Sequence, residues 1–275
     1  MSATDIEGLE VRLLVEGIFQ VYGYDFRNYA EASLRRRLKQ WLLNTGFANL
    51  SEAQSRVLRD PKLFGAMLEG ITVNVSEMFR DPHFFKALRT EVVPHLKTYP
   101  FVKIWVAGCA TGEEAYSMAI LLDEEGLAGR YRIYATDINE KVLKQAEEGI
   151  YALERMQKYT RNYQKGGGTR AFADYYTARY DRAIMAGTLR EAIVFACHDL
   201  STDAGMGEMQ MVLCRNVLIY FKPVLKEQIL EVFDGCLLNG GFLCLGTKEC
   251  LAERDIAAKY AELVRGTRIY RKHYG

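Results

Sequence analysis

The sequence predicts an α/β domain built on a parallel sheet, preceded by an all-helical domain. Three observations predict this fold class. Apolar residues recur at helical spacing through the first hundred residues. From about residue 102, short apolar runs alternate with helical patterns, the order expected of a parallel sheet covered by helices on both faces. A stretch within residues 157–190 fits neither pattern and indicates a small inserted β-subdomain.

The chain has 275 residues, enough for one large domain or two moderate ones. Its formal net charge is +1, so the charge of the whole chain predicts no partner, and any charged docking surface has to be local. The N-terminal MSATDIEGLE lacks the basic and apolar regions of a signal peptide, and no window reaches the ~18 apolar residues of a membrane span. We therefore expect a cytoplasmic protein without membrane insertion.

The cysteines form no C-x-x-C pair, and most of them lie in apolar runs. Buried free thiols are therefore favoured over zinc ligands or disulfides, and we expect no metal site. The six are Cys109, Cys197, Cys214, Cys236, Cys244 and Cys250.

The helical domain is expected over residues 1–85. Gly46 can end one helix, and Ser51 with Gln54 resembles a capping box that begins the next. Pro61 can begin another helix, because its missing N–H would have no helical partner there anyway. The apolar residues at helical spacing include Leu9, Leu13, Leu14, Ile18, Leu34, Leu38, Trp41 and Leu42.

The α/β domain is expected over residues 86–275. Helical patterns at 113–122 and near 140–148 follow its first two predicted strands. The insertion within 157–190 carries three successive glycines at 166–168 and many tyrosines, and we expect short antiparallel strands and a mobile loop there. The predicted strands lie at 102–107, 131–135, 192–196, 211–214, 241–245 and 268–271.

A glycine turn follows the first predicted strand. Gly108 and Gly112 can let the backbone approach a ligand closely, and α/β sheets bind ligands at the carboxyl ends of their strands. The turn is not G-x-G-x-x-G, and Glu113 and Glu114 follow it with a charge that would repel phosphates. A cationic, phosphate-free cofactor such as S-adenosylmethionine (SAM) suits this turn better. A plain strand-to-helix turn, with glutamates favoured by the helix dipole, is the alternative.

Asp137 comes directly after the second predicted strand. An acidic residue at this place can accept both ribose hydroxyls of an adenosine cofactor. The alternative is an aspartate that caps the next helix. Together with the glycine turn, Asp137 indicates a nucleoside site.

Polar residues also follow the predicted strand at 211–214. Arg215, Asn216 and Tyr220 stand where the sheet edge opens, and burying them without partners would cost about 1–3 kcal/mol each. A site explains them better than a core does, with ordinary capping at the start of a loop as the alternative.

The last candidate segment, residues 72–80, ends the helical half of the chain. Its polar residues Asn74, Ser76 and Arg80 lie within two helical turns. An exposed helix face explains this pattern as well as a site would.

Four segments together resemble the CheR family of chemotaxis-receptor methyltransferases: ITVNVSEMFRD, IWVAGCATGEEAYSMAI, YATDI and LCRNVLIYF. The resemblance covers nearly the whole chain. It implies an all-helical N-terminal domain, a Rossmann-like SAM-dependent methyltransferase domain and a small inserted β-subdomain. It also implies a monomer that methylates glutamate side-chain carboxylates on methyl-accepting chemoreceptors and releases S-adenosyl-L-homocysteine (SAH).

The resemblance also implies roles for individual residues. Tyr220 matches the tyrosine near the transferred methyl, and Arg80 reaches into the cofactor site. Ser76 replaces a commoner threonine, and Asp199 stands where asparagine is common, so an amide donor is lost there. The implied cofactor-binding residues are Asn74, Ser76, Arg80, Gly108, Glu114, Asp137, Asp199, Leu200, Cys214 and Arg215.

The expected chemistry needs no general base. A glutamate side chain, with a reference pKa of ≈ 4.3, is already ionised at neutral pH, so the enzyme has only to position and desolvate it. We expect Arg80 and Tyr220 to orient the substrate carboxylate.

A basic helix offers a docking surface for the acidic helices of a receptor's cytoplasmic region. Its cations are Arg35, Arg36, Arg37 and Lys39, and a solvated helix face is the alternative. In some members of the CheR family, the resemblance implies, the inserted β-subdomain binds a peptide at the receptor's C-terminus. The insertion of this chain is longer than in those members, so we expect docking that does not need the peptide.

Two other functions remain open. An RNA methyltransferase could use the basic and tyrosine-rich stretch 157–182, although the near-zero net charge and the lack of a [DN]-P-P-[YFW] motif argue against nucleic acid. A SAM-binding signalling protein without turnover is the second alternative, and intact Arg80 and Tyr220 argue against it.

Overall fold

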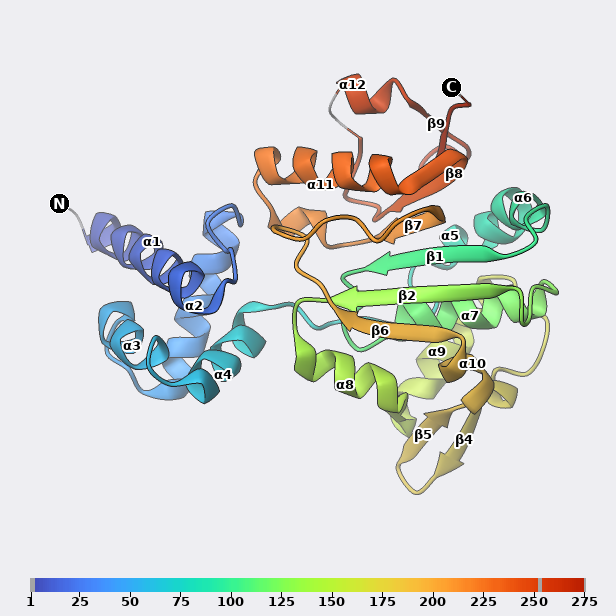
Figure 1. Cartoon of the computed structure of the whole chain (residues 1–275). Helices are drawn as coiled ribbons and strands as arrows, with labels where there is room; N and C mark the ends of the chain where they lie inside the picture. Colours follow the sequence, from blue (N-terminus) through green and yellow to red (C-terminus); the bar gives the residue numbers. More distant parts are fainter. Residues whose placement is uncertain (1–2, 252–253, 275) are drawn as a thin grey trace. The chain divides into compact units, whose positions relative to one another are not determined.

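The computed structural model describes residues 3–251 and 254–274, which form two compact units (Figure 1). The helical unit comprises Met1–Asn74, Asp199–Asp203 and Ile219–Ile229. The sheet unit comprises Val75–His198, Ala204–Leu218 and Leu230–Gly275. The domain boundary predicted after residue 85 falls inside a helix of the sheet unit, α5 (Pro82–Ala87), and stays a prediction.

The helical unit is built from amphipathic helices around a core that includes Leu14, Ile18, Leu38 and Trp41. Among the apolar residues at helical spacing, Leu9 and Leu13 lie instead on the exposed side. Its helices are α1 (Ala3–Tyr22), α2 (Glu31–Thr45), α3 (Leu50–Val57), α4 (Pro61–Ile71) and the first part of α11 (Pro223–Cys236), which ends in the sheet unit.

Two of the three predicted helix boundaries are confirmed. Gly46 ends α2 with a φ of 76°, and α4 begins at Pro61. The capping box expected at Ser51 is wrong. Asn49 caps α3 by accepting from the N–H of Glu52, while the Glu52 carboxylate accepts from the N–H of Ala48. The sequence Asn49–Glu52 offered the same signature two residues earlier, and asparagine caps as well as serine.

The sheet unit holds a seven-stranded sheet in the order β6-β2-β1-β7-β8-β10-β9. The first five strands in this order are parallel, and β10 and β9 are antiparallel to their neighbours. All six predicted strands are confirmed within a few residues, and β9 was not predicted. The strands are β1 (Val102–Ala107), β2 (Tyr131–Asp137), β6 (Ile193–Cys197), β7 (Met209–Cys214), β8 (Leu237–Leu245), β9 (Tyr260–Glu262) and β10 (Ile269–Lys272).

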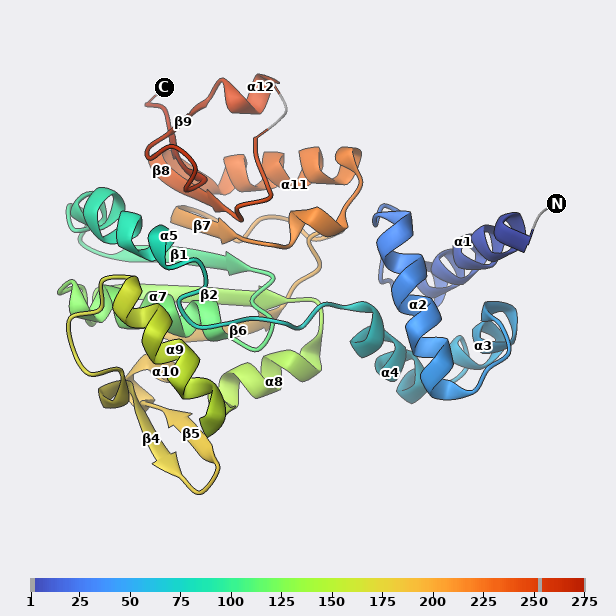
Figure 2. The same ribbon diagram turned by 180° about the vertical axis from the view of Figure 1, so that it is seen from behind.

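Helices cover both faces of this sheet, as the side chains of β1 show. Ile104 and Val106 join the core cluster that contains residues of α7 (Glu113–Glu124). Trp105 points to the other face, where its ring packs against Phe233 of α11 at 5.1 Å between centroids. Figure 2 shows α7 and α5 in front of the sheet. Further helical segments of this unit are η1 (Leu88–Val92), α6 (Val93–Leu96), α8 (Glu140–Glu148) and α12 (Arg254–Ala257).

The insertion between β2 and β6 forms an antiparallel three-stranded sheet in the order β3-β5-β4. Two of its strands lie within the predicted range 157–190, and the third, β3, lies before that range. The insertion also contains a helix, α9, that the sequence analysis did not predict. Buried Met156, Tyr159 and Tyr163 give α9 an apolar stripe at helical spacing. The elements are β3 (Ile150–Ala152), α9 (Leu153–Lys165), η2 (Phe172–Tyr175), β4 (Tyr176–Arg179), β5 (Arg182–Met185) and α10 (Gly187–Glu191).

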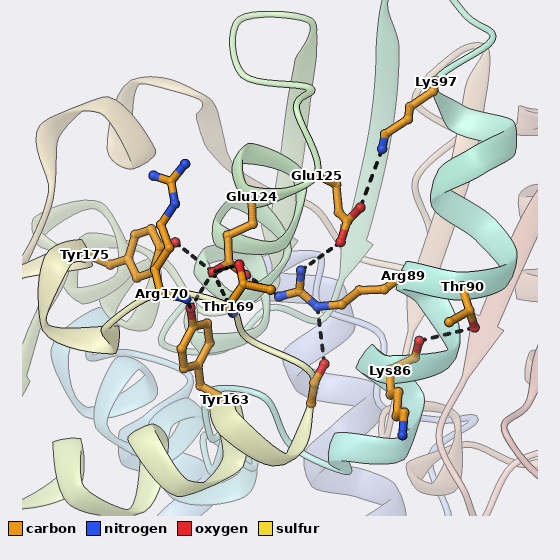
Figure 3. A network of polar contacts seen from close by, with 11 residues as sticks. Lys86, Arg89, Thr90, Lys97, Glu124, Glu125, Tyr163, Thr169, Arg170 and Tyr175 are labelled. Carbon is orange, nitrogen blue, oxygen red and sulfur yellow. Dashed lines mark hydrogen bonds and ion pairs between the residues drawn. The ribbon is translucent and has the colours of Figure 1, made fainter.

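A buried carboxylate ties the insertion to the rest of the sheet unit (Figure 3). The side chain of Glu124, at the end of α7, is 1% exposed and pairs with Arg89 of η1. It also accepts hydrogen bonds from Tyr163 of α9, Tyr175 of η2 and the N–H of Thr169. Because Arg89 also donates to the carbonyl of Gly166, the loop expected to be mobile is bonded at both its ends.

Candidate functional site

The site begins at one edge of the sheet, where β2, β1 and β7 end side by side. These strands are parallel neighbours, so their carboxyl ends meet at the same edge. The N–H groups of Gly108 and Cys109 donate to the carbonyl of Thr136, at 2.8 and 2.9 Å. The glycine turn, Asp137 and the start of the segment after β7 are thereby brought together.

Asp137 is held by backbone donors on both of its carboxylate oxygens. Oδ2 accepts from the N–H of Ala110 at 2.9 Å, and Oδ1 accepts from the N–H of Asn139 at 3.0 Å. Burial raises the pKa of Asp137, and these donors oppose the rise. The alternative that Asp137 caps the next helix is wrong, because the side chain of Asn139 caps α8. Each oxygen of Asp137 keeps capacity for another donor, as a ribose diol would require.

The two glycines of the turn are also required by packing inside the protein. Gly108 has a φ of 74°, and a Cβ there would lie 2.4 Å from the Val217 side chain. Gly112 has a φ of 89°, and a Cβ there would lie 2.9 Å from Cβ of Ala146. Close approach of a ligand is therefore not needed to explain either glycine.

Both glutamates after the turn are engaged within the protein. The Glu113 carboxylate accepts from Oγ1 of Thr111 at 2.6 Å and pairs with Arg155 of α9 at 3.6 Å. Glu114 pairs with Arg215 at 2.6 Å. Burial raises the pKa of both glutamates. The negative charge of Glu113 and Glu114, which was expected to repel phosphates, is thus largely offset by Arg155 and Arg215.

Arg215 links three elements of this edge. Its guanidinium is 1% exposed, pairs with Glu114 at the start of α7 and with Asp81 at 2.8 Å, and lies 3.9 Å from the centre of the Phe84 ring. It also donates to the carbonyl of Arg80 at 3.5 Å. Sequence reasoning found Arg215 and Glu114 but gave no role to Asp81, the last residue of the segment ITVNVSEMFRD, or to Phe84 beyond it.

Arg80 lies on an irregular segment, not on a helix. The alternative of an exposed helix face is wrong, because residues 73–81 form neither helix nor strand. Phe79 and Asp81, on either side of Arg80, have φ values of 51° and 58° in the left-handed region. Within the described ranges, the Arg80 side chain has no hydrogen-bond or ion-pair partner.

Four of the expected site residues, Asn74, Asp199, Leu200 and Tyr220, belong to the helical unit. The Asp199 carboxylate accepts from the N–H and Oγ of Ser201, at 2.8 and 2.5 Å. The carbonyl of Tyr220 accepts from the N–H of Ala30 at 2.7 Å. Local contacts thus hold Asp199 and Tyr220, and the roles of all four residues stay predictions.

Two family models match the chain. The all-alpha domain of CheR methyltransferase matches residues 9–72, and the SAM-binding domain of CheR methyltransferase matches residues 74–266. The chain belongs to the CheR methyltransferase family. SAM is therefore the cofactor, and the predicted fold class is confirmed.

Three curated relatives of this CheR family member match between 78% and 96% of its length. Cher3 of Pseudomonas putida, provisionally named as a methyltransferase, is 50% identical over 264 residues, which cover 96% of this chain and 97% of that protein. The chemotaxis protein methyltransferase of Listeria innocua is 30% identical over 229 residues, covering 82% and 84%. Chemotaxis protein methyltransferase 1 of Pseudomonas aeruginosa is 31% identical over 235 residues, covering 78% and 80%.

The basic helix α2 of this CheR protein does not present its four cations alike. Arg36 and Lys39 are exposed, and Arg35 pairs with Glu31 at 2.7 Å. Arg37 turns inward, because it donates to the carbonyl of Ile71 at 2.6 Å and lies 4.4 Å from the centre of the Tyr220 ring. Burial lowers the pKa of Arg37. The expectation that all four lie on the polar faces is wrong for Arg37.

In the described part of the chain the cysteines are free thiols. Cys197 and Cys250 are exposed, contrary to the general expectation of burial, and the other cysteines are buried free thiols. Among the described residues, no group of three or more histidines, cysteines and acids could hold a metal ion. None of the described helices is long and apolar enough to span a bilayer.

Proposed function

We propose that this chain transfers the methyl group of SAM to glutamate side-chain carboxylates on a chemoreceptor. The family match and the relatives named as chemotaxis protein methyltransferases support this substrate class. The observation that carries the proposal is the Arg80 side chain, which forms no hydrogen bond or ion pair within the described ranges, acts on Glu114 only through its charge, and lies on a segment joined by Arg215 to the sheet edge of Asp137. An unpaired cation beside a nucleoside site suits an anionic group.

The residues of this edge fit the cofactor by their donor and acceptor chemistry. Asp137 would accept from the ribose hydroxyls with its remaining lone pairs. Glu114 and Arg215, bound to each other, would act chiefly by fixing the turn and the Arg80 segment. The proposed cofactor set is Asn74, Ser76, Arg80, Gly108, Glu114, Asp137, Asp199, Leu200, Cys214 and Arg215.

The reaction then depends on positioning. When bound, SAM supplies a sulfonium-activated methyl group that an ionised carboxylate attacks without a general base. Arg80 would hold a carboxylate by charge-assisted hydrogen bonds, and the Tyr220 hydroxyl would donate a further one. Asp137 would fix the cofactor's ribose, so that the methyl group faces the held carboxylate.

A tritium-transfer assay on receptor membranes tests this function. We expect counts that mild base releases, because a glutamate methyl ester hydrolyses in base whereas methylated amines do not. Arg80→Ala should lower the transfer about a hundredfold with unchanged thermal stability, while Arg161→Ala, an exposed arginine of α9, should transfer normally. Base-stable counts, or near-normal transfer by Arg80→Ala, would contradict the proposal.

The structure weakens the argument for an RNA substrate. Of the tyrosines in the basic stretch 157–182, Tyr159, Tyr163 and Tyr175 are buried. Buried rings cannot stack on bases, which leaves Tyr176 and the exposed Tyr180. The same assay separates the alternatives, since methyl groups on RNA would enter an RNase-sensitive fraction and a protein without turnover would give no counts.

A further inference from the structure

The helix α9 of the insertion contacts two segments of the proposed cofactor site. We propose that α9 positions the Arg80 segment, and that Asn162 is the positioning residue that holds it. This inference rests on the proposed function only through the role given to Arg80. The contacts that carry it all lie within the sheet unit.

Asn162 holds the backbone of the Arg80 segment directly. Its side-chain Nδ2 donates to the carbonyl of Met78 at 3.1 Å, two residues before Arg80. One turn earlier on α9, Lys158 forms an ion pair with Glu77. The helix α9 therefore binds two successive residues of the segment, Glu77 and Met78.

The segment needs such support because it has no secondary structure of its own. Phe79 and Asp81 occupy the left-handed region, which costs a non-glycine residue about 1 kcal/mol or more and persists only where surrounding contacts enforce it. The Phe79 ring is buried and packs against Phe85, Tyr163 and Phe172, whereas the polar contacts of the segment are few. The N–H of Phe79 donates to Oγ of Ser117 at 2.9 Å, and the side chain of Asp81 pairs with Arg215.

Asn162 and Ser117 hold the same peptide group, the one that joins Met78 to Phe79, and Arg215 acts on the other side of Phe79. Asn162 fixes the carbonyl just before Phe79, whereas Arg215 fixes the carbonyl of Arg80 and the side chain of Asp81. The direction of the Arg80 side chain follows from the backbone between the two anchors. Loss of Asn162 leaves this peptide group with the bond to Ser117 and should therefore loosen the placement of Arg80.

The same helix also supports the glycine turn. Arg155 of α9 pairs with Glu113, and the hydroxyl of Tyr159 donates to the same carboxylate at 3.3 Å. Tyr151, in the strand just before α9, donates to the carbonyl of Thr111 at 2.7 Å. The helix α9 thus contacts both the Arg80 segment and the glycine turn, and we infer that it fixes their relative placement.

Helix stability does not explain Asn162. Asparagine is among the weaker helix formers, and at position 162 it lies three residues before the end of α9, too far to cap it. Its side chain is half-buried and makes one described hydrogen bond, the one to Met78. Removing that bond should therefore leave the fold intact and change the position of the Arg80 side chain.

Calorimetric binding of SAH to the full chain tests the inference without turnover. Asn162→Asp keeps the shape of the side chain but replaces the donor by an acceptor, and Asn162→Ala removes the group. Both should weaken SAH binding about tenfold, or about 1.4 kcal/mol, with an unchanged melting temperature. Arg161→Ala, the neighbouring exposed position, is the matched control and should bind normally.

A double-mutant cycle separates positioning from a general effect. In an Arg80→Ala background, Asn162→Asp should weaken SAH binding less than twofold, because the side chain that it positions is gone. Full additivity, or normal SAH binding by both Asn162 variants, would overturn the inference. In transfer assays the KM for SAM should rise, and kcat should fall because Arg80 is also proposed to orient the receptor carboxylate.

The outcome for the proposed function can be read separately. If the wild type labels no receptor but the cycle shows coupling, the proposed substrate fails and the role of Asn162 stands. If the wild type labels receptor glutamates and the Asn162 variants behave as the wild type does, the inference fails and the function stands.

Discussion

Arg215 is the residue whose expected role the structure changes most. The family resemblance made it a cofactor contact, yet its guanidinium is committed to Glu114, Asp81 and the carbonyl of Arg80. The sequence could show that a polar residue follows a buried strand. It could not show the partner, because Asp81 lies more than a hundred residues away along the chain. Arg215 is therefore a structural centre of the site, and Arg80 is the cation there without a described hydrogen bond or ion pair.

Arg215→Leu should destabilise the protein by about 3 kcal/mol, because it strands the buried carboxylate of Glu114. Urea unfolding at neutral pH measures this. The double variant Arg215→Leu/Glu114→Gln should recover part of the loss, since the stranded charge is gone. An unchanged unfolding midpoint, or no recovery in the double variant, would show that the pair contributes little.

The elements of the sheet were predictable, and those of the insertion were only partly so. A strand buried on both faces, such as β7, gives an apolar run, here residues 211–214, that sequence alone reveals. In α9 the apolar positions are mostly tyrosines, which also suit strands, so composition pointed to β-structure and hid the helical spacing of Met156, Tyr159 and Tyr163. The hydrogen-bond partner of Tyr163, Glu124, lies on α7 and was not visible from the insertion.

Glu124 should make the attachment of the insertion depend on pH. Burial alone would raise the pKa of Glu124, but the bonds from Tyr163 and Arg89 outweigh burial and lower it. A lowered pKa gives stability that is present above the unfolded value of about 4.5 and is lost as the pH falls through the folded value.

Glu124→Gln should therefore be less stable than the wild type at pH 7, and the difference should shrink below about pH 4.5. Urea unfolding across this range measures the difference. Glu125→Gln is the control, because Glu125 is more exposed and accepts from fewer donors, so its effect should be smaller. A difference that stays constant down to pH 3 would rule out this role for the ionised form.

At the scale of the whole molecule, a net charge of +1 leaves recognition to local surfaces. The helical unit supplies the proposed surface on α2, and the structure narrows it to two fully usable cations, Arg36 and Lys39. Arg37 is unsuitable for testing docking, since its reversal would also break the bond to the carbonyl of Ile71. Sequence spacing could place these residues on one helix but could not say which of them the rest of the unit covers.

Charge reversal of the exposed pair, Arg36→Glu with Lys39→Glu, should raise the KM for receptor membranes about tenfold at low salt and leave SAH binding unchanged. Exposed charges act over about 10 Å at 0.1 M salt, so added salt should weaken the wild type toward the variant and change the variant little. Lys144→Glu, an exposed cation of α8 in the sheet unit, should have no such effect. Equal KM values for wild type and variant at low salt would remove α2 as the docking surface. A matching loss with Lys144→Glu would mean that net charge alone, with no defined surface, attracts the receptor.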